Sequence, residues 1–451
     1  MDICDIRKEL KVPFRLNRDS EFIMILGNTL VVGAGPAGIQ TSQILAPFSQ
    51  KIALISKSSH QWENRKRLMR QHGNVASCEV SKPQLAPLVG LIRFDELYTD
   101  LSPLPSSWDT LVLATPAHAY CDVLASFSEL CLKNLKQIIL MSSMIGGCLI
   151  LKGILKKKKL SPNIILFSSY FATSHFSSNP TTQHPLTVTT KTVKKRVYIY
   201  LSEPNDVLFN ALRNALEKVN VQVVLFDNPF SVEGRNAAAY VHPAFLINTF
   251  SLDHILSNED DTKYMYKLYP EGPITMELIK ELLHHWKSIS RLLEHYSAEP
   301  INLLQLLNDE NLPVLEATIP KDKIDSFNEL NEIEQEYLLY VRYSTILIDP
   351  TPFSESNTKK STFEVSAKPY LKGKVRKGRL QLPRTPLEDL QTLYWLNHLV
   401  QQSSLISSIS FQSIEVFESW VKERNLPTTL IQALKQRASE YYVHATPSIS
   451  Q

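Results

Sequence analysis

The sequence predicts an α/β fold, with a doubly wound and mostly parallel sheet in the N-terminal half and mostly α-helices in the C-terminal half. Two observations support this prediction. Short apolar runs that end in small or hydroxyl residues recur through the first half, and such runs are typical of buried parallel strands. After Asp227 the apolar residues follow helical spacing instead.

Composition excludes several classes of protein. The chain has 451 residues, 43% of them hydrophobic, which excludes a disordered protein, and its net charge of +3 gives no nucleic-acid footprint. We interpret the basic run Lys156 to Lys159 as a solvated surface turn. The N-terminal segment carries charges throughout, so we do not expect it to be a signal peptide, and no apolar run is long enough to predict a membrane span. The five cysteines show no metal-ligand spacing, so we expect a cytoplasmic protein without a bound metal.

A glycine cluster opens the predicted sheet. In the segment NTLVVGAGPAGIQTSQILA, a predicted strand at Leu30–Val32 precedes a predicted helix at Ile39–Ala46, with Gly33, Gly35 and Gly38 between them in GxGxxG register. The first glycine permits a tight turn, the second lets a pyrophosphate approach the backbone, and the third allows close helix–strand packing. The context predicts a Rossmann-like domain that binds a dinucleotide.

The residues after the next strand indicate which dinucleotide. The strand Lys51–Ile55 leads to Lys57, Ser58 and Ser59, where NAD and FAD proteins usually carry an acidic residue. A cation and hydroxyls suit an adenosine 2′-phosphate, which favours NADPH over NADH. A plain polar loop is the alternative. Flavin is disfavoured because the acidic residue and a later Gly-Asp motif are both missing.

Further strands continue the pattern. We expect Thr115, Ser142 and Ser143, which follow two of these strands, to line the cofactor site, although helix capping would explain them equally well. Residues Ser177 to Thr190 are rich in Ser, Thr and Pro and are interpreted as a loop. The predicted strands are Thr110–Ala114, Gln137–Met141, Ile164–Phe167, Arg196–Leu201 and Val221–Phe226, with a helix over Asn205–Val219.

The C-terminal half is predicted to be mostly helical, with one interruption. A β-hairpin insertion is expected near residues 361–382, around two glycines. We expect an N-terminal extension over residues 1–23, a nucleotide-binding domain over 24–228 and a substrate domain over 229–451. The long predicted helices are Pro273–Tyr296, Glu332–Ile348 and Leu387–Gln402.

Three stretches of the second half combine unusual residues. The first holds His242, which could exchange protons because a histidine titrates near working pH; a structural histidine is the alternative. In the second, Lys267 and Glu271 could contact a zwitterionic substrate, or could belong to a turn and helix cap. In the third, Arg342 and Asp349 lie in an apolar run, where they could bind a carboxylate and a histidine respectively, or form an internal ion pair.

These stretches carry a resemblance to a known family. The segments RNAAAYVHP, YKLYPEGPIT and EYLLYVRYSTILIDP closely resemble those of the opine metallophore dehydrogenases, the staphylopine, pseudopaline and yersinopine synthases. The agreement runs from about Leu30 to Asp389, where PRTPLED also resembles the family. Residues 1–23 lie outside it, and Met24 looks like an alternative start. The resemblance implies an opine dehydrogenase-type helical domain after the nucleotide-binding domain.

The resemblance also implies a reaction. Family members use NADPH to condense an α-keto acid reductively with the primary amine of a His-aminobutyrate intermediate, and the nicotianamine-like product binds the metal. Pyruvate and 2-oxoglutarate both remain open as the keto acid. A nicotianamine-like synthase would supply the amine, and a homodimer is compatible with the sequence.

Site residues follow from the same resemblance. His242 is implied as general acid/base, with Asp349 as its expected partner, and Lys57 as the group for the 2′-phosphate. The implied substrate-binding residues are Arg342, Asn236, Lys267 and Tyr240. One departure is the stretch at 168–173, which lacks an acidic residue that the staphylopine enzyme carries there.

Two other functions remain as alternatives. A keto-acid reductase would share the NADP site but would need no amine. A non-catalytic NADPH-sensing protein would bind the cofactor without turnover.

Overall fold

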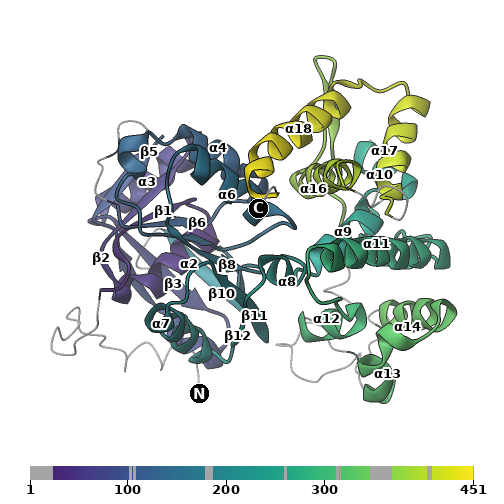
Figure 1. The fold of residues 1–451 in the computed structure, drawn as a ribbon, viewed down its shortest axis with the longest axis horizontal. Helices are drawn as coiled ribbons and strands as arrows, with labels where there is room; N and C mark the ends of the chain where they lie inside the picture. Colours follow the sequence, from purple (N-terminus) through teal and green to yellow (C-terminus); the bar gives the residue numbers. More distant parts are fainter. Residues whose placement is uncertain are drawn as a thin grey trace.

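The structure is a computed structural model that describes residues 24–100, 104, 108–177, 186–257, 262–310, 314, 316–345, 368–403 and 409–449. A sheet-containing part, residues 24–226, is joined through helix α8 (Pro229–Glu233) to a mostly helical part (Figure 1). The predicted fold class is confirmed. The predicted N-terminal extension lies outside the described residues. None of the described helices is long and apolar enough to cross a membrane.

The main sheet contains the predicted strands. In the described part of the chain it has eight strands in the order β12-β11-β8-β7-β6-β1-β2-β5. Neighbours run parallel except β8 and β11, which are antiparallel. The chain order reverses beside β1, at the point where open α/β sheets bind ligands. The bounds are β1 Gly27–Val32, β2 Ser49–Ser56, β5 Glu96–Thr99, β6 Thr110–Leu113, β7 Gln137–Leu140, β8 Asn163–Phe167, β11 Arg196–Leu201 and β12 Gln222–Phe226.

Both faces of this sheet are buried, which explains the continuous apolar runs of its strands. Leu30 and Val32 of β1 face one hydrophobic cluster, whereas Val31 faces the other, as strand alternation requires. The first cluster includes residues of α4 (Tyr120–Ser126) and α6 (Gly147–Lys157). The second includes residues of α2 (Pro36–Leu45) and α7 (Asp206–Glu217).

A smaller sheet packs beside α2, and the sequence reasoning missed it. Its order is β4-β3-β10-β9. The predicted loop at Ser177–Thr190 is partly wrong, because Thr187–Thr190 belong to β10: they pair with β3, and Val188–Thr190 also pair with β9. The β-branched Thr-Val-Thr-Thr run suits a strand better than its polarity suggests. The bounds are β3 Val75–Val80, β4 Gly90–Arg93, β9 Ala172–Phe176 and β10 Thr187–Val193.

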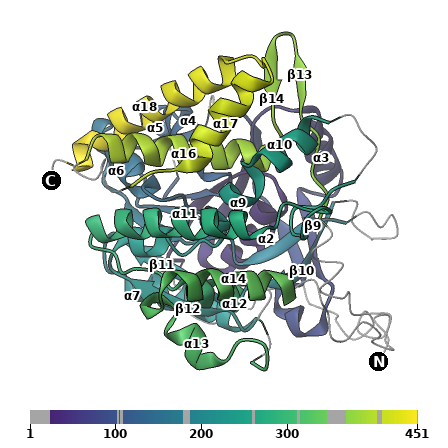
Figure 2. The same cartoon turned by 90° about the vertical axis from the view of Figure 1, so that its right-hand side faces the viewer.

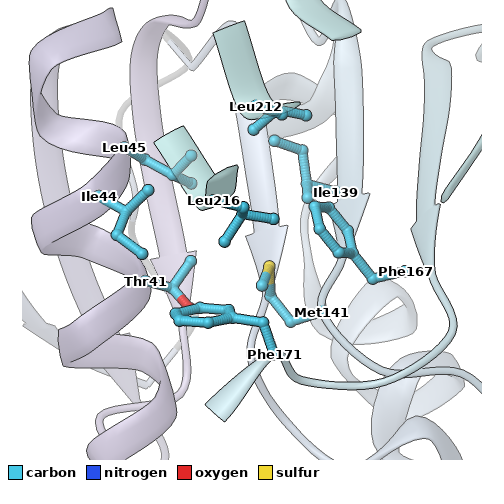
Figure 3. A pocket seen from close by; sticks show the side chains of 9 residues that line it. All are labelled: Thr41, Ile44, Leu45, Ile139, Met141, Phe167, Phe171, Leu212 and Leu216. Atoms are coloured by element: carbon cyan, nitrogen blue, oxygen red, sulfur yellow. The ribbon is translucent and has the colours of Figure 1, made fainter. Parts of the chain in front are cut away.

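A cavity of about 20 Å³ lies under α2 and α7, on the face of the sheet that forms the second cluster (Figure 3). Its lining is apolar apart from Thr41. The volume suits at most one water molecule, so this cavity is a packing gap and not a ligand site.

Three long helices of the helical part, α11, α14 and α16, are ones that the apolar spacing predicted, whereas α9 and α18 were not predicted. Helix α9 packs against both α11 and α16, and α14 packs on the far side of α11 (Figure 2). The hairpin expected near 361–382 includes an antiparallel pair, Lys374–Arg376 with Arg379–Gln381. The bounds are α9 Ala238–Leu246, α10 Thr249–Leu256, α11 Met276–His295, α12 Leu303–Glu310, α13 Lys321–Asp325, α14 Glu332–Thr345, α16 Arg384–Gln401, α17 Gln412–Glu423 and α18 Thr429–Ile449.

Helix α18 returns to the sheet-containing part and packs on α6 (Figure 1). Lys156 and Lys157, at the end of α6, donate hydrogen bonds to the carbonyls of Pro447 and Val443. Cations stabilise the C-terminus of a helix, where carbonyls lack partners. The basic run is therefore not merely a solvated turn, since two of its lysines hold the last turns of α18.

Candidate active site

The glycine turn has the geometry that the sequence predicted. Gly33 adopts φ +115°, which only glycine adopts readily, and its N–H donates to the carbonyl of Ile55 at 2.8 Å. A Cβ on Gly38 would lie 1.8 Å from the carbonyl oxygen of Gly33, so no side chain fits between helix and turn. These two glycines bring the start of α2 to the carboxyl end of β1.

Gly35, between them, faces open space. A Cβ there would meet nothing within 4 Å, and Gly35 is the N-cap of α2 without any side-chain cap. The first N–H groups of α2 therefore point outward with the positive end of the helix dipole. A phosphate group fits this position, since it needs donors, positive potential and close backbone approach.

The polar residues after β2 differ in their hydrogen bonding. Lys57 is exposed, as a residue that meets a phosphate must be. The Ser58 N–H donates to Asp100 Oδ1 at 2.9 Å, and Ser59 Oγ accepts from the Trp62 N–H at 3.1 Å, which caps α3 (His60–Gln71). The Ser59 hydroxyl therefore caps α3, a role for which serine is strongly preferred at the start of a helix.

Thr115 and Ser142 follow the adjacent strands β6 and β7. The Thr115 methyl would lie 3.3 Å from a Cβ on Gly33, so this side chain borders the glycine turn. Its hydroxyl is buried and has no hydrogen-bond partner among the described residues. A buried hydroxyl without a partner is costly, and a bound cofactor could satisfy it. Ser142 is partly exposed, and its carbonyl accepts a hydrogen bond from the Tyr120 hydroxyl.

His242 meets a carboxylate in the structure. Its Nδ1 lies 3.6 Å from Asp389 Oδ1, which joins α9 to the first turns of α16. The two side chains are 24% and 13% exposed, so the pair is largely shielded from water. Burial raises the pKa of Asp389, an effect that His242 opposes. The other carboxylate oxygen, Oδ2, is buried without a hydrogen bond to any described residue.

This pair lies beside the carboxyl edge of the main sheet. Glu388, the residue before Asp389, approaches the ring of His118 to 3.9 Å, and His118 follows β6 shortly after Thr115. On the same helix, Trp395 Nε1–H donates to the carbonyl of Ile145 at 2.9 Å, in the turn after β7. Helix α16 therefore connects the His242–Asp389 pair to the turns that follow β6 and β7.

Phe245, on the helix that carries His242, contacts aromatic residues of the second and third unusual stretches. Phe245, one turn after His242, contacts the ring of Tyr266 with centroids 5.7 Å apart and that of Tyr343 at 5.0 Å. Tyr266 is also near enough to Asp389 for its charge to add to burial in raising the tyrosine pKa. The sequence reasoning did not select Tyr266, although it opens the YKLYPEGPIT segment.

Several predicted substrate residues are engaged inside the protein. Tyr240 is fully buried and its hydroxyl donates to the carbonyl of Gly234 at 2.8 Å. Arg342 donates to the carbonyl of Leu307 at 2.9 Å, and Lys267 pairs with Glu271 at 2.8 Å.

Two further predictions concern neighbouring positions. Asn236 Oδ1 accepts from the Ala238 N–H at 3.3 Å, at the start of α9. Asp349, the expected partner of His242, lies outside the described residues. The carboxylate that the structure places at His242 is Asp389, whose only sequence signal was the PRTPLED segment.

The chain is similar to several known proteins over most of its length. The staphylopine dehydrogenase family profile matches residues 27–439. Pseudopaline synthase of Pseudomonas aeruginosa (strain UCBPP-PA14) is 36% identical over 370 residues, which cover 82% of this chain and 84% of the relative. Staphylopine synthase of Staphylococcus aureus (strain Mu50 / ATCC 700699) is 32% identical over 398 residues, with 87% and 90% covered. The NADP+-bound structure of yersinopine dehydrogenase superposes with a TM-score of 0.80 at 25% identity, covering 94% of this chain and 99% of that one.

Proposed function

The chain belongs to the staphylopine dehydrogenase family of NAD(P)-dependent opine dehydrogenases, and from this premise we propose that it joins an α-keto acid to an amino-acid-derived amine with NADPH as reductant. The keto acid is pyruvate or 2-oxoglutarate, and the amine is a His-aminobutyrate intermediate supplied by a nicotianamine-like synthase. The product is a secondary amine that carries the metal-binding groups. The observation that carries this proposal is the His242–Asp389 pair, which helix α16 connects to the turns after β6 and β7.

The residues around the glycine turn suit a phosphorylated dinucleotide. Gly35 leaves room for a pyrophosphate at the start of α2, and the buried Thr115 hydroxyl has no hydrogen-bond partner among the described residues. Lys57, exposed after β2, supplies a cation for the 2′-phosphate in place of the acidic residue that NAD proteins carry. When bound, NADPH supplies the hydride that reduces the imine.

The reaction balances without any further reactant. The amine nitrogen attacks the keto carbon and the carbonyl oxygen leaves as water, which forms a C=N bond. A hydride then adds to that carbon and a proton to nitrogen, which gives the secondary amine. Both the loss of water and the final protonation need a proton donor close to the reacting carbon.

His242 is our candidate for that donor. Asp389 faces Nδ1, so Nε2 is the ring nitrogen that remains to exchange protons with the substrate. The Asp389 carboxylate orients the ring and stabilises its protonated form, as a carboxylate behind a catalytic histidine does. The distance of 3.6 Å is long for a hydrogen bond, and such contacts tighten when substrate binds.

The experiment that tests the proposal follows NADPH oxidation by absorbance. Each keto acid is supplied with and without the amine, and NADH replaces NADPH in a parallel series. The proposal predicts turnover only with both substrates, and faster turnover with NADPH. Oxidation without amine would instead support a keto-acid reductase, and tight NADPH binding without turnover would support a sensing protein.

A further inference from the structure

Glu233 is a buried carboxylate that the proposed mechanism does not use. It ends α8, the connection between the sheet-containing part and the helical part, and its exposed fraction is 0%. Burying a carboxylate is costly unless several donors surround it. Glu233 lies nine positions before His242, and the free-energy cost of burying its carboxylate indicates that it has a specific role.

The carboxylate is held by three donors from one segment, the turn after β7. Gly146 N–H donates to Oε2 at 2.7 Å, Cys148 N–H to Oε1 at 2.7 Å, and Ser143 Oγ–H to Oε1 at 3.2 Å. Both carboxylate oxygens accept hydrogen bonds. Burial raises the pKa of Glu233 to about 8, against the opposing effect of these donors.

Glu233 supplies a cap that α6 lacks. This helix begins after Gly146, which adopts φ +77°, and it has neither a side-chain cap nor an acidic residue in its first turn. A carboxylate from elsewhere satisfies the free N–H groups and the positive helix end. The cap thus comes from a distant segment and ties α8 to the start of α6.

The turn that Glu233 holds, residues 141–147, is fixed from two other sides. Tyr120 donates to the Ser142 carbonyl, and Trp395 of α16 donates to the Ile145 carbonyl. Within the serine pair, Ser143 is buried and bound to Glu233, whereas Ser142 is partly exposed. Ser143 is thus anchored, and Ser142 beside it lies at the carboxyl edge of β7. The neighbouring strand is β6, which Thr115 follows.

We propose that Glu233 is a positioning residue for the reaction: through Ser143, Gly146 and Cys148 it holds the 141–147 turn so that Ser142 faces the reacting groups. This inference rests on the proposed function for its kinetic consequence. It predicts that loss of the carboxylate lowers kcat while cofactor affinity changes little, because Gly35, Lys57 and Thr115, the other residues assigned to the cofactor, lie outside the 141–147 turn.

The test compares E233Q, S143A and the double variant with wild type. Glutamine keeps the shape but turns an N–H2 toward the backbone donors, so at least one hydrogen bond is lost. We expect kcat to fall roughly 10- to 100-fold in E233Q, as misplacement of a site by about 1 Å can cause. The Kd for NADPH, from fluorescence, should stay within about twofold. S143A should lower kcat less, and the double variant should be no worse than E233Q.

A matched control separates positioning from lost stability. T29V removes a buried hydrogen bond of 2.9 Å between Thr29 and Ser49, near the start of β1 and β2 and away from the turn. It should lower Tm without lowering kcat. An E233Q enzyme that loses Tm like T29V but keeps the wild-type kcat would overturn the proposal. If E233Q does not fold, an S143A enzyme with wild-type kcat would overturn it too.

Hydrogen exchange separates this inference from the proposed function. Amide exchange at Gly146 and Cys148 should accelerate in E233Q and stay unchanged in T29V. Unchanged exchange in E233Q would overturn the role of Glu233 whatever the reaction. A wild-type enzyme that never oxidises NADPH with both substrates would contradict the proposed function, even if exchange at the turn accelerates as expected.

Discussion

His242 of α9 and Asp389 of α16 meet with 3.6 Å between Nδ1 and Oδ1, within the helical part of the chain. The two residues come from separate helices, so their contact depends on how α9 and α16 pack. Helix α16 also contacts the turns after β6 and β7 through Glu388 and Trp395. The packing of one helix thus connects the His242–Asp389 pair to the turns after β6 and β7, where we propose that the cofactor binds.

The first prediction concerns that pair. H242Q should lower kcat by about 100- to 10,000-fold with little change in NADPH affinity, because it removes the proton-exchanging group. D389N should lower kcat by a comparable factor, since an amide neither orients the ring in the same way nor stabilises its charge. Steady-state kinetics and NADPH titration check both variants.

D349N is the contrast for this prediction. The family resemblance suggested Asp349 as the partner of His242, and the structure places Asp389 there. We therefore expect D349N to retain more activity than D389N. The opposite order would show that Asp349 and not Asp389 supports His242.

The second prediction uses the different surroundings of two glycines. G38A should destabilise the protein by about 1–3 kcal/mol or more, because its Cβ would lie 1.8 Å from the Gly33 carbonyl oxygen. G35A should leave Tm nearly unchanged, since a Cβ there meets nothing, yet should weaken NADPH binding roughly tenfold or more through lost contacts to a charged group. Thermal unfolding with and without NADPH measures both effects. Equal NADPH affinity in G35A and wild type would contradict the pyrophosphate assignment.

The third prediction tests Lys57 as the group for the 2′-phosphate. A charge-assisted hydrogen bond contributes about 1.5–3 kcal/mol, so K57A should raise the KM for NADPH roughly 10- to 100-fold. The KM for NADH should not change, because NADH has no such phosphate. K51A, an exposed lysine on the preceding strand, is the matched control and should behave like wild type. A K57A enzyme that keeps its preference for NADPH would place the phosphate site elsewhere.

The fourth prediction concerns stability in acid. Burial lowers the pKa of His285 to about 4, against 6.5 for the free side chain, and its Nε2 lies 2.9 Å from the Ala239 carbonyl oxygen. Between these values the unfolded chain binds the extra proton, so the free energy of unfolding should fall as pH drops from 6.5 to 4, by roughly 3 kcal/mol at most. Urea unfolding at several pH values measures this slope.

The matched variants are H285Q and H284Q. H285Q should show a smaller loss of stability over this pH range, although it is less stable at neutral pH. H284Q changes the partly exposed neighbour on the same helix and should keep the wild-type slope. Equal slopes in wild type and H285Q would contradict the assignment to His285.

The nucleotide-binding half was largely predictable because its signals are local. The order of strand, Gly33–Gly38 turn and helix α2 follows from backbone demands that glycine alone meets. Continuous apolar runs identified β1, β2, β6, β7 and β8 because both faces of a parallel sheet are buried. The smaller sheet was missed, since its Thr-rich strand β10 is polar and its pairing with β3 joins distant segments.

The catalytic half was less predictable because its contacts are long-range. Family resemblance drew attention to His242, yet no local pattern could show that its neighbour is Asp389. Local patterns also do not reveal burial. Tyr240 and Arg342 look like ligand residues in the sequence but donate to backbone carbonyls in the core. No role was predicted for Glu233, because its three hydrogen-bond donors belong to a segment far away in the chain.

The most direct test of the account is to follow the hydride. The enzyme is given NADPH deuterated at the transferred position, the amine and one keto acid, and the product is examined by mass spectrometry. The account predicts a secondary amine that contains both carbon skeletons and carries the deuterium on the carbon that was the keto carbon. Deuterium found instead in a hydroxy acid, with the amine unchanged, would contradict it.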